Sequence, residues 1–437
     1  MRLVDSGYAF TSVDVRGRGD SDGVWCPWVN DGTDGAEVIE WAAAQKWSTG
    51  DVATIGGSYD AITQWWAAVH RPAHLRCMIA ISVSPLHEMS GPLGRSNGVV
   101  MPYWLWWLHL LQDPSPERAV IDWDDVLNAP PAEMALRAGV PDGPWQQYLA
   151  GQIGYGEQSW AIDPLDVEVP VLVTNGLWDD PKTFELWQAL AGSTRTADHR
   201  LIVGAWDHAG NGAPRPILGS VDVSAAITDP VPHWIAFLDH WMRGGPAPSE
   251  TALVARSGSW EWERHEQWPP PGTTSSTFEL AGGGWEHDPS APIVQPRDGP
   301  DLAWADAPLD PAWLENRGDV WTGDLPVATE PQHLSGAPEV RLIASQPQPG
   351  TLVCWLTDVA PDGTRLQLGL WPTAAAHPGG SAAVSFGLAA INHALKPGHH
   401  VRIGLASSFA PIYAHALVPY SVTVTDVQLD LPRSPTS

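Results

Sequence analysis

The stretch that decides the fold is Ala53–Ala61, which reads A-T-I-G-G-S-Y-D-A. An apolar run leads to two glycines and to Ser58, and the residues from Ile62 onward have the composition of a helix. A strand, a G-x-S turn and a helix form the sharp corner that exposes a serine hydroxyl at one end of a parallel sheet. The stretch therefore predicts an α/β fold and makes Ser58 a candidate nucleophile.

Apolar runs and amphipathic segments alternate on both sides of this corner. The expected strands are Tyr8–Val15, Asp51–Ile55, Leu75–Val83, Val169–Thr174 and His199–Val203. The expected helices are Gly35–Gln45, Tyr59–His70, Lys182–Leu190 and Pro230–Arg243. Strands that alternate with helices indicate a mostly parallel sheet covered by helices.

Changes of composition divide the 437 residues into segments. We expect residues 1–85 and 164–246 to form the two parts of the α/β core. Residues 86–163 are rich in Trp, Leu and Pro. They interrupt the alternation of strands and helices and are typical of a helical insertion. From residue 247 to 437, short β-like runs alternate with turns rich in Pro and Gly, which predicts a β-sandwich or jelly roll.

The composition excludes several classes of partner. A net charge of −27, with Lys46, Lys182 and Lys396 as the only lysines, argues against nucleic acid and against an anionic membrane surface. The sequence has no apolar run of about 18 residues, so we expect no membrane span. It also begins without the apolar segment of a signal peptide, and we expect a cytoplasmic location. Three scattered cysteines and no Cys/His cluster predict neither a disulfide framework nor a metal site, and we expect no cofactor.

A serine hydroxyl becomes a nucleophile when a base takes its proton, and the base needs a carboxylate to orient it. In α/β hydrolases these groups follow one another in the order Ser, acid, His, and the acid and the His come after later strands. Asp179 and His208 each lie just past one of the later apolar strands, within N-G-L-W-D-D-P and G-A-W-D-H. We therefore predict a triad of Ser58, Asp179 and His208, with Asp180 as a rival for the place of the acid.

With these motifs in place, the chain resembles the cocaine-esterase/X-Pro dipeptidyl-peptidase (CocE/NonD) family of serine hydrolases. The matching segments extend over most of the chain and include Gly7–Gly23, Gly56–Trp65, Gly176–Asp179, Val203–His208, Phe237–Gly244 and Leu356–Gly363. The resemblance implies an α/β-hydrolase core, an inserted helical cap and a C-terminal jelly roll.

By position, the resemblance also implies roles for particular residues. It makes Ser58 the nucleophile, Asp179 the orienting acid and His208 the base, and it makes the backbone N–H of Tyr59 one donor of the oxyanion hole. The substrate that it implies is a small-molecule ester, an amide or a peptide.

Two tryptophans flank the acid and the base in the sequence. We expect Trp178 and Trp206 to line the substrate pocket, because large aromatic side chains next to catalytic groups commonly form its walls.

The chain departs from the family pattern at the corner. Ala61 stands where the family has a glycine, and we expect slight crowding of helix against strand. Asp60 either complements the positive end of the helix, which we favour, or receives a substrate amino group.

The chain also departs from the family pattern at its N-terminal end. In the family, the strand that begins at Gly7 follows three strands and a helix, and a loop there carries a Tyr that is the second oxyanion donor. Met1 falls inside that helix. We expect either that the reading frame starts upstream or that this form is weakly active, because one oxyanion donor contributes about 10²–10³ in rate.

Three functions follow as hypotheses. The first is a serine hydrolase of the esterase or acylase type that acts through an acyl-enzyme. The second is an X-Pro dipeptidyl-peptidase, which uses the same chemistry but must receive a free amino terminus. The third is a non-catalytic remnant that acts only as a binding protein. A homodimer is also compatible with the sequence, although nothing in the sequence requires it.

Overall fold

The computed structural model describes residues 2–25, 30–82, 99–112, 120–140, 142–149, 163–180, 182–192, 198–219, 221–294 and 310–435. Contacts between Cα atoms divide the chain into two compact units. The first unit contains Met1–Ser90, Gly154–Pro216 and Val223–Trp268, and the second contains Gly91–Ile153, Ile217–Asp222 and Pro269–Ser437. The four segments expected from the sequence stay a prediction.

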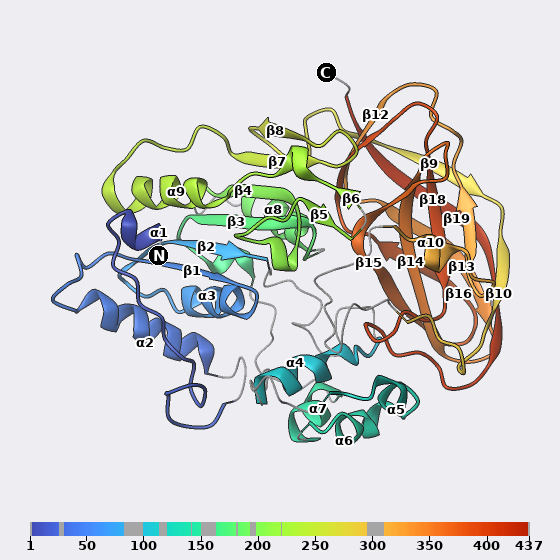
Figure 1. Cartoon of the computed structure of the whole chain (residues 1–437), viewed down its shortest axis with the longest axis horizontal. Coiled ribbons are helices and arrows are strands. Elements are labelled where there is room, and N and C mark those ends of the chain that lie inside the picture. The colour runs from blue at the N-terminus through green and yellow to red at the C-terminus, as the bar shows by residue number, and fades with distance from the viewer. Residues whose placement is uncertain are drawn as a thin grey trace. The chain divides into compact units, whose positions relative to one another are not determined.

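A six-stranded sheet forms the centre of the first unit, in the order β1-β2-β3-β4-β7-β8 (Figure 1). Its strands are β1 (Val52–Gly57), β2 (Leu75–Ile81), β3 (Val171–Trp178), β4 (Arg200–Asp207), β7 (Ala252–Arg256) and β8 (Glu261–His265). All neighbours from β1 to β7 pair in parallel, and β8 is antiparallel to β7. Because parallel strands end on the same side, the residues that follow β1, β3 and β4 share one edge of the sheet.

Helices lie on both faces of this sheet, with α9 on one face and α2 and α3 on the other (Figure 1). Trp234 and Phe237 of α9 pack in one apolar cluster with Ile79 of β2 and Trp206 of β4. The helices of this unit are α1 (Arg2–Asp5), α2 (Asp31–Ala43), α3 (Tyr59–Val69), α8 (Thr183–Ala191) and α9 (Val231–Arg243). Its 3₁₀ turns are η3 (Pro164–Asp166), η4 (His208–Gly210) and η5 (Ser224–Ala226).

The prediction of a strand at Tyr8–Val15 is wrong, because the structure gives this segment no regular element. Phe10 and Val13 are 58% and 49% exposed. A strand is stable only when a neighbour satisfies its N–H and C=O groups, and none of the described strands pairs with this segment. An alternating pattern in the sequence cannot report whether such a neighbour exists.

The second unit contains two antiparallel sheets and a short hairpin. One sheet has the order β16-β13-β19-β12-β17, with β9 and β10 also paired to β19, and the other has the order β11-β18-β14-β15. The strands are β5 (Ile217–Leu218), β6 (Val221–Asp222), β9 (Thr274–Leu280), β10 (Gly283–His287), β11 (Trp321–Asp324), β12 (Gln332–Gly336), β13 (Glu339–Gln346), β14 (Gly350–Val359), β15 (Arg365–His377), β16 (Gly380–Gly387), β17 (Ile391–Leu395), β18 (His400–Ala406) and β19 (Tyr420–Ser434).

Side chains from both sheets meet in one core. Val340 and Leu429 of the larger sheet and Cys354 and Ile403 of the smaller one are each 0% exposed and belong to the same cluster. Two sheets that share an apolar core form a sandwich. The predicted fold class, an α/β core followed by a β jelly roll, is confirmed.

The second unit also holds short helices in the region expected to be a helical insertion. They are α4 (Tyr103–Gln112), α5 (Trp123–Leu127), η2 (Pro131–Glu133), α6 (Met134–Arg137) and α7 (Asp142–Leu149), and α10 (Ala312–Glu315) lies farther along. Aromatic rings pack there, with Trp145 and Tyr148 stacked at 5.0 Å between ring centroids. Within the described residues, no helix has both the length and the apolar character needed to cross a membrane.

Candidate active site

Ser58 occupies the corner between β1 and α3, with φ 58° and ψ −123°. A positive φ is unfavourable for a residue with a side chain and costs about 1–3 kcal/mol. Backbone hydrogen bonds hold the conformation. Ser58 N donates to Ile81 O at 3.0 Å, and Ser58 O accepts from the N–H groups of Ala61 at 2.9 Å and Ile62 at 3.2 Å. The corner predicted from the sequence is therefore built by the main chain.

The residues around Ser58 explain the spacing of the motif. A Cβ atom on Gly56 would lie 2.6 Å from Cβ of Asp60, so a glycine lets the strand approach the helix. Ala61, which replaces a glycine of the family pattern, is fully buried. Asp60 lies in the first turn of α3, where a carboxylate is favoured by the helix dipole, and burial raises its pKa. Its alternative role toward a substrate amine stays a prediction.

Asp179 and His208 come together at the edge of the sheet where β3 and β4 end. Nδ1 of His208 lies 2.8 Å from Oδ1 of Asp179. Asp179 is only 5% exposed. Burial by itself lowers the pKa of His208, but the charge and hydrogen bond of Asp179, together with the charges of Asp207 and Asp180, offset this effect, and the pKa of His208 is raised.

The neighbouring carboxylate, Asp180, has a different environment. Its Oδ1 accepts a hydrogen bond from the backbone N–H of Lys182 at 3.0 Å, and its carbonyl accepts one from Asn175 at 3.0 Å. Asp180 thus caps the turn that leads into α8, whereas Asp179 contacts the histidine.

Ser58 shares this edge because β1 runs parallel to β4 within the same sheet. In the part of the chain that the structure describes, no hydrogen bond joins the Ser58 hydroxyl to the His208 imidazole. Hydrogen bonds of catalytic groups are often long without substrate and shorten when it binds.

Tyr59 begins α3 directly after Ser58. Its N–H is one of the first N–H groups of the helix, which cannot bond to a carbonyl within the helix and point toward its N-terminal end. Its hydroxyl donates to Oδ2 of Asp31 at 2.7 Å, and burial is the largest cause of the raised pKa of this phenol. The side chain therefore ties the start of α3 to the start of α2.

The two tryptophans expected to line the substrate pocket are buried, Trp178 at 1% and Trp206 at 0% exposure. Trp178 packs at 6.1 Å from Trp260, and Trp206 at 6.0 Å from Trp262, between ring centroids. In the described structure both indoles therefore belong to the core. A contact with substrate stays a prediction.

The candidate site also includes Asn211, which was not identified from the sequence and lies with Arg215 on the loop after His208. Asn211 Nδ2 donates to Oδ2 of Asp179, and Trp206 Nε1 donates to Asn211 Oδ1 at 2.8 Å. Arg215 forms an ion pair with the buried Asp207 at 2.6 Å. Their short distance from His208 along the chain was the one available signal, and it does not reveal these contacts.

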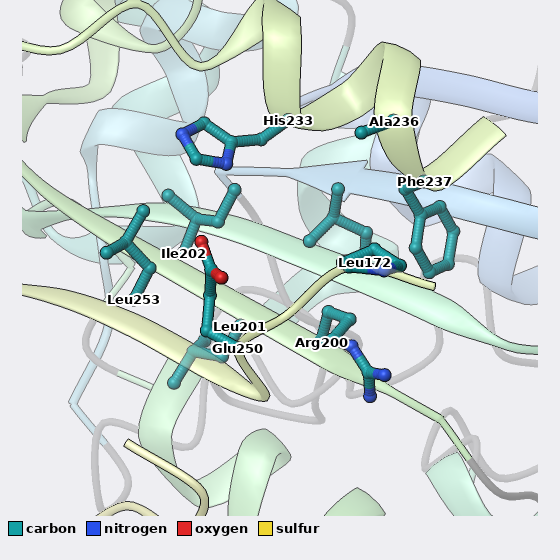
Figure 2. Close-up of a pocket in the computed structure, with 10 residues that line it drawn as sticks. Leu172, Arg200, Leu201, Ile202, His233, Ala236, Phe237, Glu250 and Leu253 are labelled. Atoms are coloured by element: carbon teal, nitrogen blue, oxygen red, sulfur yellow. The ribbon is translucent and has the colours of Figure 1, made fainter. Parts of the chain in front are cut away.

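A small pocket lies away from these residues. Figure 2 shows it between α9, which supplies His233 and Phe237, and the sheet, which supplies Leu172. Arg200, the first residue of β4, also lines it, whereas His208 follows the last residue of that strand. The pocket is thus at the opposite end of β4 from the candidate triad. Among the described residues, no group of three or more His, Cys, Asp or Glu side chains is arranged to hold a metal ion.

Two family models match successive parts of the chain. A model described as X-Pro dipeptidyl-peptidase (S15 family) matches residues 1–210. A second model, described as the X-Pro dipeptidyl-peptidase C-terminal non-catalytic domain, matches residues 239–430. The two models together cover most of the chain.

Individual relatives agree with this assignment. A cocaine esterase of Rhodococcus sp. (strain MB1 Bresler) is 26% identical over 483 residues, which cover 94% of this chain and 82% of the relative. A putative serine esterase of Mycobacterium bovis is 23% identical over 534 residues, which cover 94% and 80%.

Solved structures share the fold. An α-amino acid ester hydrolase matches with a TM-score of 0.80 at 21% identity, over 96% of this chain and 85% of the other. An aminopeptidase from a marine sediment archaeon, Thaumarchaeota archaeon, matches with a TM-score of 0.77 at 19% identity, over 96% and 84%. The resemblance seen in the sequence is confirmed: the chain belongs to the CocE/NonD, X-Pro dipeptidyl-peptidase (S15) family of serine hydrolases.

Proposed function

We propose that this serine hydrolase cleaves ester or amide bonds through an acyl-enzyme formed on Ser58, with His208 as the base and Asp179 as the orienting acid. The observation that carries the proposal is the 2.8 Å contact between His208 Nδ1 and Asp179 Oδ1. It is supported by Ser58, whose backbone has the strained conformation of a nucleophile corner at the same edge of the sheet.

The contact with Asp179 defines what His208 does. When Nδ1 carries the proton that Asp179 accepts, Nε2 is left as the basic nitrogen of the ring. The raised pKa of His208 makes the imidazole a stronger base while the carboxylate stabilises the imidazolium that forms.

The reaction then proceeds in two halves. Nε2 of His208 takes the proton of Ser58 Oγ as that oxygen attacks the substrate carbonyl, and the oxyanion accepts a hydrogen bond from the N–H of Tyr59. His208 returns the proton to the leaving alcohol or amine as the acyl bond breaks. Water, activated by the same imidazole, attacks the acyl-enzyme, and Ser58 is restored.

An ester or amide of a small molecule is the substrate class that we favour. X-Pro dipeptide release is the second candidate, because both family models carry that name. A binding protein without catalysis is the third. A cytoplasmic location stays a proposal. A homodimer also stays a proposal, and light scattering of the purified chain would decide whether it forms.

The first experiment uses a fluorophosphonate probe, which reacts only with an activated serine. Labelling mapped to Ser58 by peptide mass spectrometry is the expected result. The Ser58→Ala variant should not be labelled, whereas Ser12→Ala, which changes an exposed serine in an irregular segment, should be labelled like the wild type. A folded protein that is not labelled at Ser58 would support the non-catalytic alternative.

The second experiment compares substrates. We expect p-nitrophenyl acyl esters to be hydrolysed with a higher kcat/KM than Gly-Pro-p-nitroanilide. The reverse order would assign the chain to dipeptide release. Loss of both activities in Ser58→Ala would show that Ser58 is the nucleophile for both substrates.

A further inference from the structure

The amide of Asn211 lies between two buried side chains of the candidate active site. Its Nδ2 donates to Oδ2 of Asp179 and also lies 3.2 Å from the carbonyl oxygen of Asp207. Its Oδ1 accepts a hydrogen bond from Nε1 of Trp206 at 2.8 Å. Trp206 is fully buried. A single amide therefore connects an indole of the core with the carboxylate that contacts His208.

The chemistry of Trp206 determines which way this amide faces. An indole N–H only donates hydrogen bonds, so the group that faces it must be the oxygen of Asn211 and not the nitrogen. The nitrogen then points to Asp179, where it can only donate. A flipped amide would place two donors face to face and two acceptors face to face. The donor toward Asp179 is thus fixed by the core.

The two oxygens of Asp179 consequently have different partners. Oδ1 contacts His208 at 2.8 Å, and Oδ2 accepts from Asn211. The side chain of Asp179 is 4% exposed, so Oδ2 has little access to water and depends on a protein donor. With both oxygens held, the carboxylate plane cannot rotate about its terminal bond.

We propose that Asn211 is a positioning residue for catalysis, which fixes the Asp179 carboxylate and, through it, the orientation of the His208 ring. Trp206 supports this role by orienting the amide. The inference deepens the proposed function and rests on it for its effect on rate. Asn211 itself touches no reacting atom, so its loss should lower kcat and leave KM nearly unchanged.

Two variants separate the hydrogen bond from the shape of the side chain. Asn211→Ala removes both. Asn211→Leu keeps the approximate size and branched shape of the side chain but can form no hydrogen bond with Asp179 or Trp206. Loss of a hydrogen bond to a charged group predicts a fall of about 10–100-fold in kcat for hydrolysis of p-nitrophenyl acetate. We expect this fall in both variants, with KM within about twofold of wild type.

Arg215→Ala is the matched control. Arg215 lies on the same loop and binds Asp207, so its removal loosens the loop while the bond from Asn211 to Asp179 stays. We expect kcat in this variant to stay within about threefold of wild type, even if thermal unfolding occurs at a lower temperature. If Arg215→Ala loses as much kcat as Asn211→Ala, or if Asn211→Leu keeps wild-type kcat, the positioning role is overturned.

A measurement without turnover distinguishes this inference from the proposed function. The Nδ1 proton of His208 can be observed by NMR of ¹⁵N-histidine-labelled protein in the inactive Ser58→Ala background. We expect a downfield resonance that is lost or displaced when Asn211→Ala is added and is kept when Arg215→Ala is added. An unchanged resonance in the Asn211 variants contradicts the inference. If Ser58 is not labelled by the fluorophosphonate, the proposed function fails, and this resonance alone decides whether Asn211 orients Asp179 and His208.

Discussion

Nδ1 of His208 lies 2.8 Å from Oδ1 of Asp179, although 29 positions separate the two residues in the chain. The contact forms because β3 and β4 are parallel neighbours, so that the residues after each strand meet at one edge of the sheet. It places the charge of a buried carboxylate beside a partly exposed imidazole, and the pKa of His208 is raised as a result.

Asp179→Asn should lower kcat by about 10⁴-fold, because an amide can donate to Nδ1 and so favours the wrong tautomer of His208. The pKa of His208 should fall when the carboxylate charge is removed. The residual activity should therefore reach its plateau at a lower pH than wild-type activity does, since the base loses its proton at lower pH. The pH profile of kcat/KM measures both effects.

Asp180→Asn is the control for that variant. Its side chain accepts from the Lys182 N–H, and an amide oxygen can still do so. We expect kcat within a few-fold of wild type. A loss as large as that of Asp179→Asn would mean that the two carboxylates act as one group.

Gly204→Ala should destabilise the first unit. A Cβ atom on Gly204 would overlap the ring of Trp206, which is fully buried and has no room to move. Overpacking of this kind costs about 1–3 kcal/mol in free energy of unfolding. Urea denaturation would measure the loss. Gly318→Ala, where a Cβ atom would meet nothing within 4 Å, should leave stability nearly unchanged.

His199 should make stability depend on pH. Burial lowers its pKa from 6.5 to about 4, and its Nδ1 accepts a hydrogen bond from the N–H of Val171 at 3.2 Å. The unfolded chain takes up a proton near pH 6.5, whereas the folded chain does so only near pH 4. Stability should therefore fall as the pH is lowered from 6.5 to 4, by about 3 kcal/mol in total.

The test of this dependence is urea unfolding at pH 7 and at pH 4.5. His199→Gln has no imidazole to protonate at this position, so its free energy of unfolding should fall less than that of the wild type between these two pH values. His70→Gln, which alters an exposed histidine, should lose stability with falling pH as the wild type does. Equal losses in wild type and His199→Gln would contradict the assignment.

Tyr59→Phe should lower the free energy of unfolding by about 1–3 kcal/mol, because it leaves a buried carboxylate of Asp31 without the phenol that donates to it at 2.7 Å. A double-mutant cycle with Asp31→Asn measures the coupling directly. Additive losses in the two single variants would show that the hydrogen bond contributes nothing.

Much of the fold was predictable because its signals are local. The corner at Ser58 depends on glycines within a few residues, and Gly56 is needed because of its contact with Asp60, four positions away. The helix Val231–Arg243 ends at Gly244, which takes the left-handed conformation with φ 68°. Likewise, alternating runs and turn residues indicated the β-sandwich.

The sequence by itself thus determined the strands and helices that carry Ser58, Asp179 and His208, and it identified these three side chains as candidates for catalysis. The tertiary structure alone decided that the predicted Asp179 carboxylate reaches the His208 imidazole, that Asn211 binds the second oxygen of Asp179, and that Tyr8–Val15 forms no strand. The reason is that adjacent residues differ in the direction of their side chains, and strands depend on partners far away in the chain. Both are set only when distant segments pack together.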